Sequence, residues 1–199
     1  MERLMMDRKD LLLLFILGSE KHVGRYVLKD MLDLQEREGV VRSKLETLKS
    51  KGFVKSNRRG STLTEKGIDY LYSLMASMGI IMIKKLDYDC LGVGPEAFGV
   101  QIRGFLLSEL QLLDIRDSAV RGGAKGAILF AFKNEQLTVP SLYEDLSEID
   151  EKLSQRLKKT FNFIDGDLLI VGFNENPWRS LEGALSSIIY ANGERRVVS

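Results

Sequence analysis

The sequence predicts an α+β protein with two domains, a mainly helical domain followed by a compact α/β sandwich. Residues 1–79 show helical periodicity interrupted by one hairpin, whereas strand-like and helical segments alternate from residue 80 onward. A chain of 199 residues is long enough to form two small domains. We therefore expect domains at 1–79 and 80–199, with Gly79 as the hinge.

The elements of the first domain are predicted from apolar spacing and from capping residues. Asp7 can cap the first helix, and Gly18 is expected to end it. Val41, Leu45 and Leu48 recur at helical spacing, so the third helix must turn them toward the core. The predicted elements are helices 7–17, 25–32 and 39–50, strands 53–56 and 61–63 around the turn 57–60, and a helix from 64 to about 78.

Three helices, a hairpin and a fourth helix, in this order, make a winged helix-turn-helix domain. The segment GVVRSKLETLKSKGFVKSNRRGSTLTEKG, residues 39–67, resembles archaeal winged-helix transcriptional regulators. The matching features are the runs Gly39–Arg42 and Lys51–Val54, Leu45 with Leu48, a basic wing turn, and the run Leu63–Gly67. The resemblance implies a DNA-binding transcriptional regulator with a recognition helix at about 39–50 in the major groove and a basic wing at 57–60.

The charge of the chain is unevenly distributed, although the net charge is only +1. Residues 1–80 carry 15 basic and 11 acidic side chains, a net of +4, whereas residues 81–199 carry 14 and 17, a net of −3. Within residues 37–59 there are eight basic and two acidic side chains, a net of +6. A local basic patch on a nearly neutral protein indicates a polyanionic partner, although a solvated helix face has the same composition.

The predicted recognition helix is small and polar on the side opposite its core residues, as a helix in the major groove must be. Hydroxyl side chains there can reach base edges, while the basic side chains on the flanks and at the wing turn can contact the DNA backbone or the minor groove. Glu46 on the same face is unfavourable, and winged helices also mediate protein contacts. The candidate DNA-binding residues are Ser43 and Thr47 for bases, Arg42 and Lys44 for phosphates, and Arg58 and Arg59 in the wing.

The second domain is predicted to be an α/β sandwich with a partly antiparallel sheet, because its strands and helices alternate without a strict βαβ rhythm. Asn176 and Pro177 can start its last helix, and Asn192-Gly193 are expected to follow the end of that helix. The predicted elements are strands 80–86 and 98–105, helix 108–120, hairpin strands 126–132 and 136–140, helix 144–161, strand 167–173, and a helix to residue 190.

Several groups in the second domain are candidates for chemistry. Arg116, Asp117 and Arg121 lie at helical spacing and can bind an anionic effector or form a salt bridge. The acidic residues between 144 and 151 can hold a cation, but we favour their role in complementing the dipole of the predicted helix 144–161. The glycine-rich segments 93–99 and 121–127 fit neither a P-loop nor a dinucleotide fingerprint, and we interpret them as turns and a helix cap.

The composition argues against catalysis and against a bound metal or cofactor. One histidine, His22, and one cysteine, Cys90, cannot build a zinc site of the usual Cys/His kind. The same scarcity excludes Ser-His-Asp and Cys-His catalysis, unless His22 is the base. We therefore expect a protein that is not an enzyme and needs no cofactor.

The chain also resembles, over most of its length, an uncharacterised archaeal family in which a winged helix precedes an α/β domain, with segments similar to IRDSAVRGGAKGAILFAF at residues 115–132. This resemblance implies a predicted regulator and carries over no catalytic residues. Two alternatives remain open, a small-molecule enzyme with a winged-helix appendage, as in some archaeal small-molecule kinases, and a protein-interaction module.

The location and the assembly of the protein are predicted from its apolar segments. The longest apolar run, residues 11–17, is too short to span a bilayer, and no signal peptide is recognisable, so we expect a cytoplasmic protein. We also expect a homodimer, because the first helix is apolar all round and the fourth helix has a wide apolar stripe. The competing explanation is that the second domain packs on the fourth helix. The residues of that stripe are Ile68, Leu71, Tyr72, Leu74, Met75 and Met78.

Overall fold

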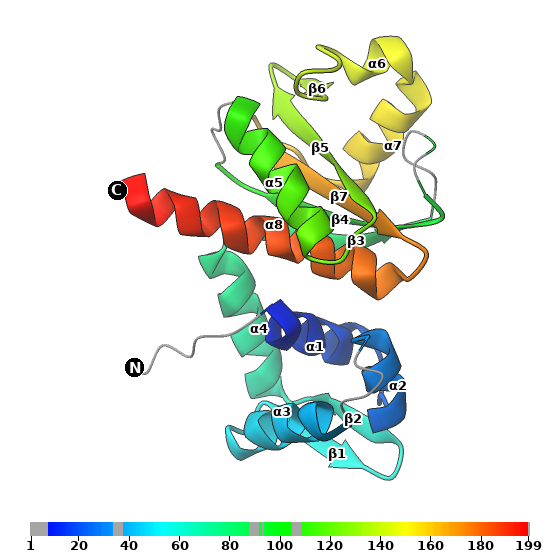
Figure 1. Ribbon diagram of the computed structural model, residues 1–199, viewed down its shortest axis with the longest axis vertical. Coiled ribbons are helices and arrows are strands. Elements are labelled where there is room, and N and C mark those ends of the chain that lie inside the picture. Colours follow the sequence, from blue (N-terminus) through cyan, green and yellow to red (C-terminus); the bar gives the residue numbers. More distant parts are fainter. Residues whose placement is uncertain (1–7, 34–37, 88–91, 93, 105–108, 199) are drawn as a thin grey trace. The chain divides into compact units, whose positions relative to one another are not determined.

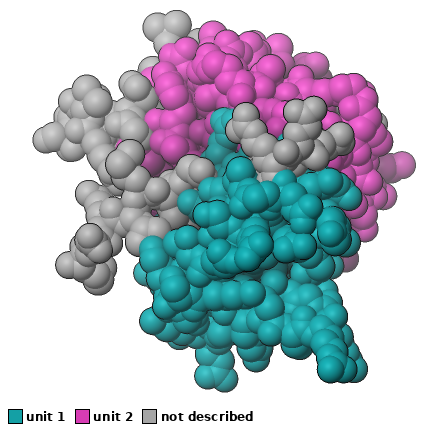
Figure 2. Space-filling view, turned by 60° about the horizontal axis from the view of Figure 1, so that its bottom comes forward, with its two compact units in different colours: residues 1–76 teal, residues 77–199 magenta. Residues whose placement is uncertain are grey.

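The computed structural model describes residues 8–33, 38–87, 92, 94–104 and 109–198. The chain forms two compact units, residues 1–76 and residues 77–199 (Figures 1 and 2). The predicted first domain ends at residue 79, and unit 1 ends at residue 76. The mixture of helices and sheet confirms the predicted α+β class. In the described part of the chain, no helix is long and apolar enough to cross a membrane.

Unit 1 has the element order of the predicted winged helix-turn-helix. Helix α1 continues through Gly18, which was predicted to end it, because the Glu20 amide still donates to the Ile16 carbonyl at 2.9 Å. A glycine with positive φ is found after α4, where Gly79 has φ of 71°. The elements are α1 (Arg8–Ser19), α2 (Arg25–Met31), α3 (Glu38–Ser50), β1 (Val54–Asn57), β2 (Gly60–Leu63) and α4 (Glu65–Ser77).

The apolar run of α1 is buried within the single chain. Its six leucine and isoleucine side chains are at most 1% exposed and Phe15 is half-buried, so α1 leaves little apolar surface for a partner to cover. This part of the argument for a homodimer was wrong, because one chain suffices to surround this helix. On α4, Leu71 and Met75 are buried, whereas Ile68 and Tyr72 remain exposed.

The segments Lys51–Val54 and Leu63–Gly67 meet at the base of the hairpin and hold it against α4. The Thr64 hydroxyl donates to the Gly52 carbonyl at 2.6 Å and accepts from the Gly67 amide at 3.1 Å, which caps α4. The ring of Phe53 stacks on Tyr70 with 4.2 Å between centroids. Gly67 packs so closely on this turn that a Cβ there would lie 2.0 Å from the Phe53 carbonyl oxygen.

Unit 2 is a five-stranded sheet between two layers of helices (Figure 1). The strand order is β3-β4-β7-β5-β6, and every neighbouring pair is antiparallel. Helix α8 packs on β4 and β7, and α5 packs on β5 and on α8. The elements are β3 (Ile80–Leu86), β4 (Glu96–Ile102), α5 (Glu109–Arg121), β5 (Gly126–Lys133), β6 (Gln136–Thr138), α6 (Leu146–Ile149), α7 (Glu151–Thr160), β7 (Leu168–Asn174) and α8 (Pro177–Val198).

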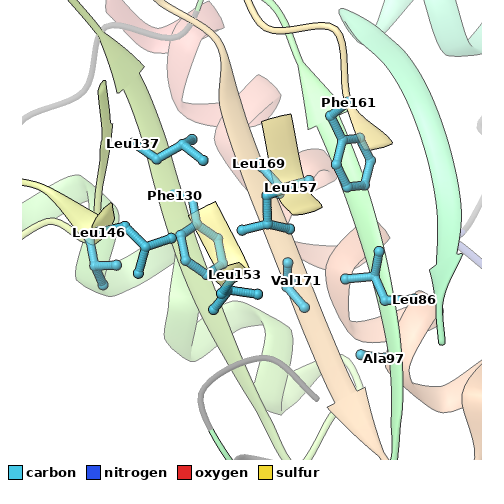
Figure 3. Packing of buried hydrophobic residues seen from close by; sticks show 11 residues of the cluster. Leu86, Ala97, Phe130, Leu137, Leu146, Leu153, Leu157, Phe161, Leu169 and Val171 are labelled. Atoms are coloured by element: carbon cyan, nitrogen blue, oxygen red, sulfur yellow. The ribbon is translucent and has the colours of Figure 1, made fainter. Parts of the chain in front are cut away.

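The other face of the sheet is covered by α6 and α7. Figure 3 shows Leu153 and Leu157 of α7 packed with Phe130, Leu169 and Val171 of the central strands. Since side chains alternate along a strand, the intervening residues of β7 face α8, and the sheet is buried on both sides. This double burial explains why β7 is a nearly continuous apolar run.

Two predicted helices of unit 2 have different bounds. The helix expected at 144–161 is divided at Asp150, whose side chain caps α7 by accepting from the Leu153 amide at 2.9 Å. The last helix was expected to stop before Asn192-Gly193 but continues to Val198. The Asn192 side chain donates to the Ile188 carbonyl at 3.0 Å, one turn earlier in the same helix, and so supports the helix instead of ending it.

Replacing Gly67 by Ala should destabilise unit 1 by about 3 kcal/mol, because the added methyl group would overlap a backbone carbonyl that the hairpin holds in place. Gly39→Ala is the matched control: a Cβ at this position would have nothing within 4 Å, and alanine should stabilise α3 by about 0.5 kcal/mol.

Urea unfolding followed by circular dichroism gives these values. The one tryptophan of the chain, Trp178, lies in unit 2, so its fluorescence reports that unit separately. Equal stability of the Gly67→Ala variant and the wild type would show that the approach of α4 to Phe53 is not tight.

Candidate nucleic-acid interface

Helix α3 presents one face to the core of unit 1 and the other to solvent. Val41, Leu45 and Leu48 are buried, as their spacing predicted. Ser43 and Thr47 lie one turn apart on the exposed face, and the Thr47 hydroxyl donates to the Ser43 carbonyl at 3.0 Å. The Thr47 oxygen keeps its lone pairs, so it can still accept a hydrogen bond from a base edge.

The hairpin places two arginines at its tip. Asn57 pairs with Gly60, so the turn consists of Arg58 and Arg59 alone, and both are exposed. The Asn57 side chain accepts from the Arg59 amide at 2.8 Å, which shapes this turn without using either guanidinium.

The hairpin is also fixed to the segment before α2. Val23 and Ser61 exchange two backbone hydrogen bonds of 2.9 Å each. Gly60 has φ of 132°, and a Cβ there would lie 2.7 Å from the Val23 backbone, so this approach requires glycine. The wing is therefore held at two places, by α4 on one side and by Val23 on the other.

A groove of about 580 Å³ lies between α3, the wing and the start of α2. Five of its lining residues are basic and one, Glu46, is acidic. The basic lining residues are Arg25, Arg42, Lys49, Arg58 and Arg59. Concentrated positive charge in a concave surface attracts a polyanion more strongly than the same charge spread over a flat surface.

Two acidic side chains pair with cations of this groove. Glu46 accepts from Arg42 at 2.8 Å, one turn away on α3, and Glu38 lies 2.9 Å from Arg25. The hydrogen bond and the charge of Arg42 lower the pKa of Glu46, so this carboxylate stays ionised at neutral pH. Both partners of the Arg42–Glu46 pair are exposed, and DNA phosphates can therefore replace Glu46 at little cost.

The structure directs Lys44 away from this surface. Lys44 was predicted to contact phosphate, but its ammonium binds the Asp10 carboxylate of α1 at 2.6 Å, and both side chains are largely buried. Breaking a shielded pair of this kind is costly, because the remaining charge would lose its partner. We therefore assign Lys44 to holding α3 on α1 and leave it out of the interface.

Three large basic or aromatic residues of the groove did not appear among the sequence candidates. Lys49 is in the last turn of α3, and Arg25 and Tyr26 begin α2. The Arg25 guanidinium lies 5.4 Å from the centre of the Tyr26 ring, and Tyr26 is 62% exposed. The sequence shows only an aromatic residue next to a basic one, and the structure adds the exposure that indicates a contact surface.

The effector candidates of unit 2 are engaged with other groups. The Arg116 guanidinium donates to the Asp117 carboxylate at 3.2 and 3.3 Å, and Arg121 lies over the Tyr190 ring at 5.9 Å. A small anion near Arg116 would meet the carboxylate of Asp117. A mainly apolar cavity of about 200 Å³ lies between α5, β5 and the segment after β6, with Arg116 among its lining residues.

Two of the acidic residues between 144 and 151, Asp145 and Asp150, cap helices. Asp145 accepts from the Ser147 amide at 2.8 Å and Asp150 from the Leu153 amide. The hydrogen bonds from Ser147 lower the pKa of Asp145. No group of three or more His, Cys, Asp or Glu side chains within the described ranges is arranged to hold a metal ion.

The glycine-rich segment 121–127 is explained by packing, and the segment 93–99 lies partly outside the described residues. A Cβ at Gly122 would lie 2.4 Å from the Cβ of Ser186 on α8. Lys125 forms an ion pair with Glu175, whose pKa is lowered by that contact.

Comparison with known proteins divides the chain in the same way. Residues 5–78 match the model of the CggR N-terminal DNA binding domain. The N-terminal unit thus resembles a known DNA-binding domain. Residues 93–190 match a domain of unknown function, DUF4443. Together the two matches support a winged-helix regulator and leave the role of the second unit unassigned.

The fold is also found in a solved archaeal structure. A hypothetical protein from Pyrococcus horikoshii OT3 matches with a TM-score of 0.72 and 22% identity, over 95% of this chain and 94% of that one. At this identity the similarity concerns the fold alone. Among curated proteins none matches the chain.

Replacing Glu46 by Gln should strengthen binding to duplex DNA about two- to fivefold, the equivalent of the 0.5–1 kcal/mol typical of a surface charge contact. The substitution removes the acid from the groove and releases Arg42 for phosphate.

Fluorescence anisotropy with a labelled duplex measures the change. Glu148→Gln, an exposed residue of α6, makes the same charge change in unit 2 and should have little effect. Weaker binding by Glu46→Gln would mean that Glu46 positions Arg42 for DNA instead of competing with it.

Proposed function

We propose that this protein is a DNA-binding transcriptional regulator in which α3 enters the major groove and the wing contacts the backbone or the minor groove beside it. The observation that carries the proposal is the basic groove formed jointly by α2, α3 and the wing. The match of residues 5–78 to a DNA-binding domain supports it independently of the geometry.

The division of labour follows from the positions of the side chains. Arg42, Lys49 and the wing residues Arg58 and Arg59 supply contacts to phosphate, which hold the protein on DNA without reading its sequence. Ser43 and Thr47 on the exposed face of α3 would read base edges. Their small size lets the helix backbone approach the floor of the major groove.

We further propose that unit 2 has no catalytic role and serves in effector binding or assembly. Its buried acids support this, because they hold the fold together: Asp167 accepts from Gln101 at 2.8 Å and from the Ile164 amide at 3.0 Å, and Glu182 pairs with Arg179 at 3.0 Å. An enzyme with a winged-helix appendage would instead need such acids free at a cleft.

The remaining expectations belong to the same proposal. We infer that the protein acts in the cytoplasm of an archaeon, as expected from the sequence, and binds its operator as a homodimer. Ile68 and Tyr72, the exposed residues of α4, remain one surface on which copies can meet. A two-fold dimer would present two recognition helices to two half-sites.

Replacing both Arg58 and Arg59 by Ala should weaken binding to all duplex sequences by a similar factor. The slope of log K against log salt should fall by roughly one unit for each phosphate that the variant no longer neutralises. A titration of binding against salt concentration gives both values.

Lys152→Ala/Lys159→Ala removes the same charge from exposed positions of α7 and should leave the slope unchanged. A wild-type slope in the wing variant would show that the wing does not contact the DNA backbone.

Ser43→Ala and Thr47→Val should instead change which DNA sequence is preferred. Valine keeps the shape of threonine but removes its hydroxyl group, so only the hydrogen bond to a base is lost. Selection from a random duplex library identifies the preferred site of each variant. Recovery of the wild-type site by both variants would contradict the placement of α3 in the major groove.

A further inference from the structure

We propose that α5 is a self-association surface, on which two copies of the chain pair their α5 helices antiparallel around a two-fold axis. The surface is the outward stripe formed by Leu113, Arg116, Asp117 and Val120. This inference concerns unit 2 and does not rest on DNA binding.

The stripe is exposed and partly apolar. Leu113 is 42% and Val120 is 49% exposed, and they lie seven residues apart, two turns along the same side of the helix. Arg116 and Asp117 lie between them, with about half of each side chain exposed. Two large apolar residues at this spacing on an outer helix face are the pattern of a helix–helix contact.

The opposite side of α5 is firmly packed, so the direction of the stripe is fixed. Ile115, Ser118 and Ala119 are buried. The Ser187 hydroxyl of α8 donates to the Ile115 carbonyl at 2.8 Å, and a Cβ at Gly183 of α8 would lie 2.8 Å from the Ala119 carbonyl. Helix α5 therefore presents the stripe as a rigid surface.

The order of residues along the stripe makes it complementary to itself. In an antiparallel pair with its two-fold axis between positions 116 and 117, residues at equal distances on either side of that axis face each other. Leu113 then faces Val120 of the second copy, and Arg116 faces Asp117 of the second copy. Each contact occurs twice, as an interface with two-fold symmetry requires. Two apolar pairs flank two pairs of opposite charge.

Within one chain the charged pair has poor geometry. Arg116 and Asp117 are neighbours in sequence, and neighbouring residues on a helix do not face each other. Their hydrogen bonds are accordingly long, at 3.2 and 3.3 Å. Exchange of partners across the interface lets each guanidinium approach a carboxylate from an opposing helix and shields the pair from solvent.

The surroundings of the stripe extend its apolar area. Leu142, after β6, is 71% exposed. Leu113 and Leu142 both line the cavity of about 200 Å³ beside α5, whose walls are mainly apolar. The second copy can cover this cavity as the two helices pair. One helix pair is smaller than a standard interface, so we expect a dissociation constant on the order of 10 µM.

Oligomeric state of the full chain, measured by sedimentation without DNA, tests the proposal. The wild-type mass should rise from 22.5 kDa toward twice that value as the concentration is raised to about 200 µM. Arg116→Asp and Asp117→Arg should each stay at 22.5 kDa, because like charges would then oppose each other across the axis. Lys152→Asp on the exposed surface of α7 is the control and should associate like the wild type.

The decisive measurement is an equimolar mixture of the two variants. Copies carrying Arg116→Asp place two carboxylates opposite the two guanidiniums of copies carrying Asp117→Arg, so the mixture should recover the dimer mass. Recovery also shows that both variants are folded. The proposal is overturned by a wild type that stays monomeric, by a single variant that still dimerises, or by a mixture of folded variants that stays monomeric. A single variant that still dimerises would assign association to another surface, such as Ile68 and Tyr72 of α4, and a mixture that stays monomeric would rule out the pairing of residue 116 with residue 117.

Discussion

The proposed DNA surface depends on the contact between α4 and the turn that follows α3. Gly67 lies against the Phe53 carbonyl, and Thr64 joins the Gly52 carbonyl to the first turn of α4. The end of α3, the start of the wing and the start of α4 are therefore held together as one unit. The spacing between the hydroxyl groups of α3 and the arginines of the wing follows from it. If α3 and the wing bind DNA together, their spacing must be fixed before binding. The contacts of Gly67 and Thr64 would then increase affinity for DNA without touching it.

The electrostatics of the groove show why net charge is a poor guide to its partner. The chain is almost neutral, yet five basic side chains line one concave surface. Glu46 and Glu38 reduce that charge by pairing with Arg42 and Arg25. Such pairs weaken binding to any DNA sequence, and a regulator that must leave wrong sites gains selectivity from weaker non-specific binding. Glu46 and Glu38 thus fit a protein that binds specific DNA sites better than one that binds DNA without sequence preference.

Local patterns in the sequence were sufficient for most elements, whereas contacts between distant residues were not. Helical spacing placed Val41, Leu45 and Leu48 correctly in the core, and glycine and asparagine marked the hairpin. The ion pair of Lys44 could not be predicted because its partner, Asp10, is 34 residues away, and a helical wheel does not show which flank meets another helix. Arg25 belongs to the groove only because the bridge between Val23 and Ser61 brings the start of α2 to the wing.

The two misjudged helix bounds of unit 2 have a related cause. Asp150 and Asn192 are residues of the same general type, with short polar side chains that compete for backbone groups. Asp150 bonds to an amide ahead of it and starts a new helix, whereas Asn192 bonds to a carbonyl behind it and continues the old one. Periodicity cannot distinguish the two, because the choice depends on which backbone groups the surrounding packing leaves unpaired.

The same distinction between packing and chemistry applies to the glycines of unit 2. The segment 121–127 has glycines and a lysine, but not the spacing of a phosphate-binding loop. Gly122 and Gly123 admit α8, Gly126 admits the Phe173 ring of β7, and Lys125 pairs with Glu175. Small residues bring α5 and α8 close together: a Cβ on Gly183 of α8 would lie 2.8 Å from the Ala119 carbonyl of α5 and 2.4 Å from Ala124, which follows α5. This tight inner contact leaves only the outer side of α5 for recognition. Function in this unit is therefore better sought on that outer helix face than in the loops that resemble ligand sites.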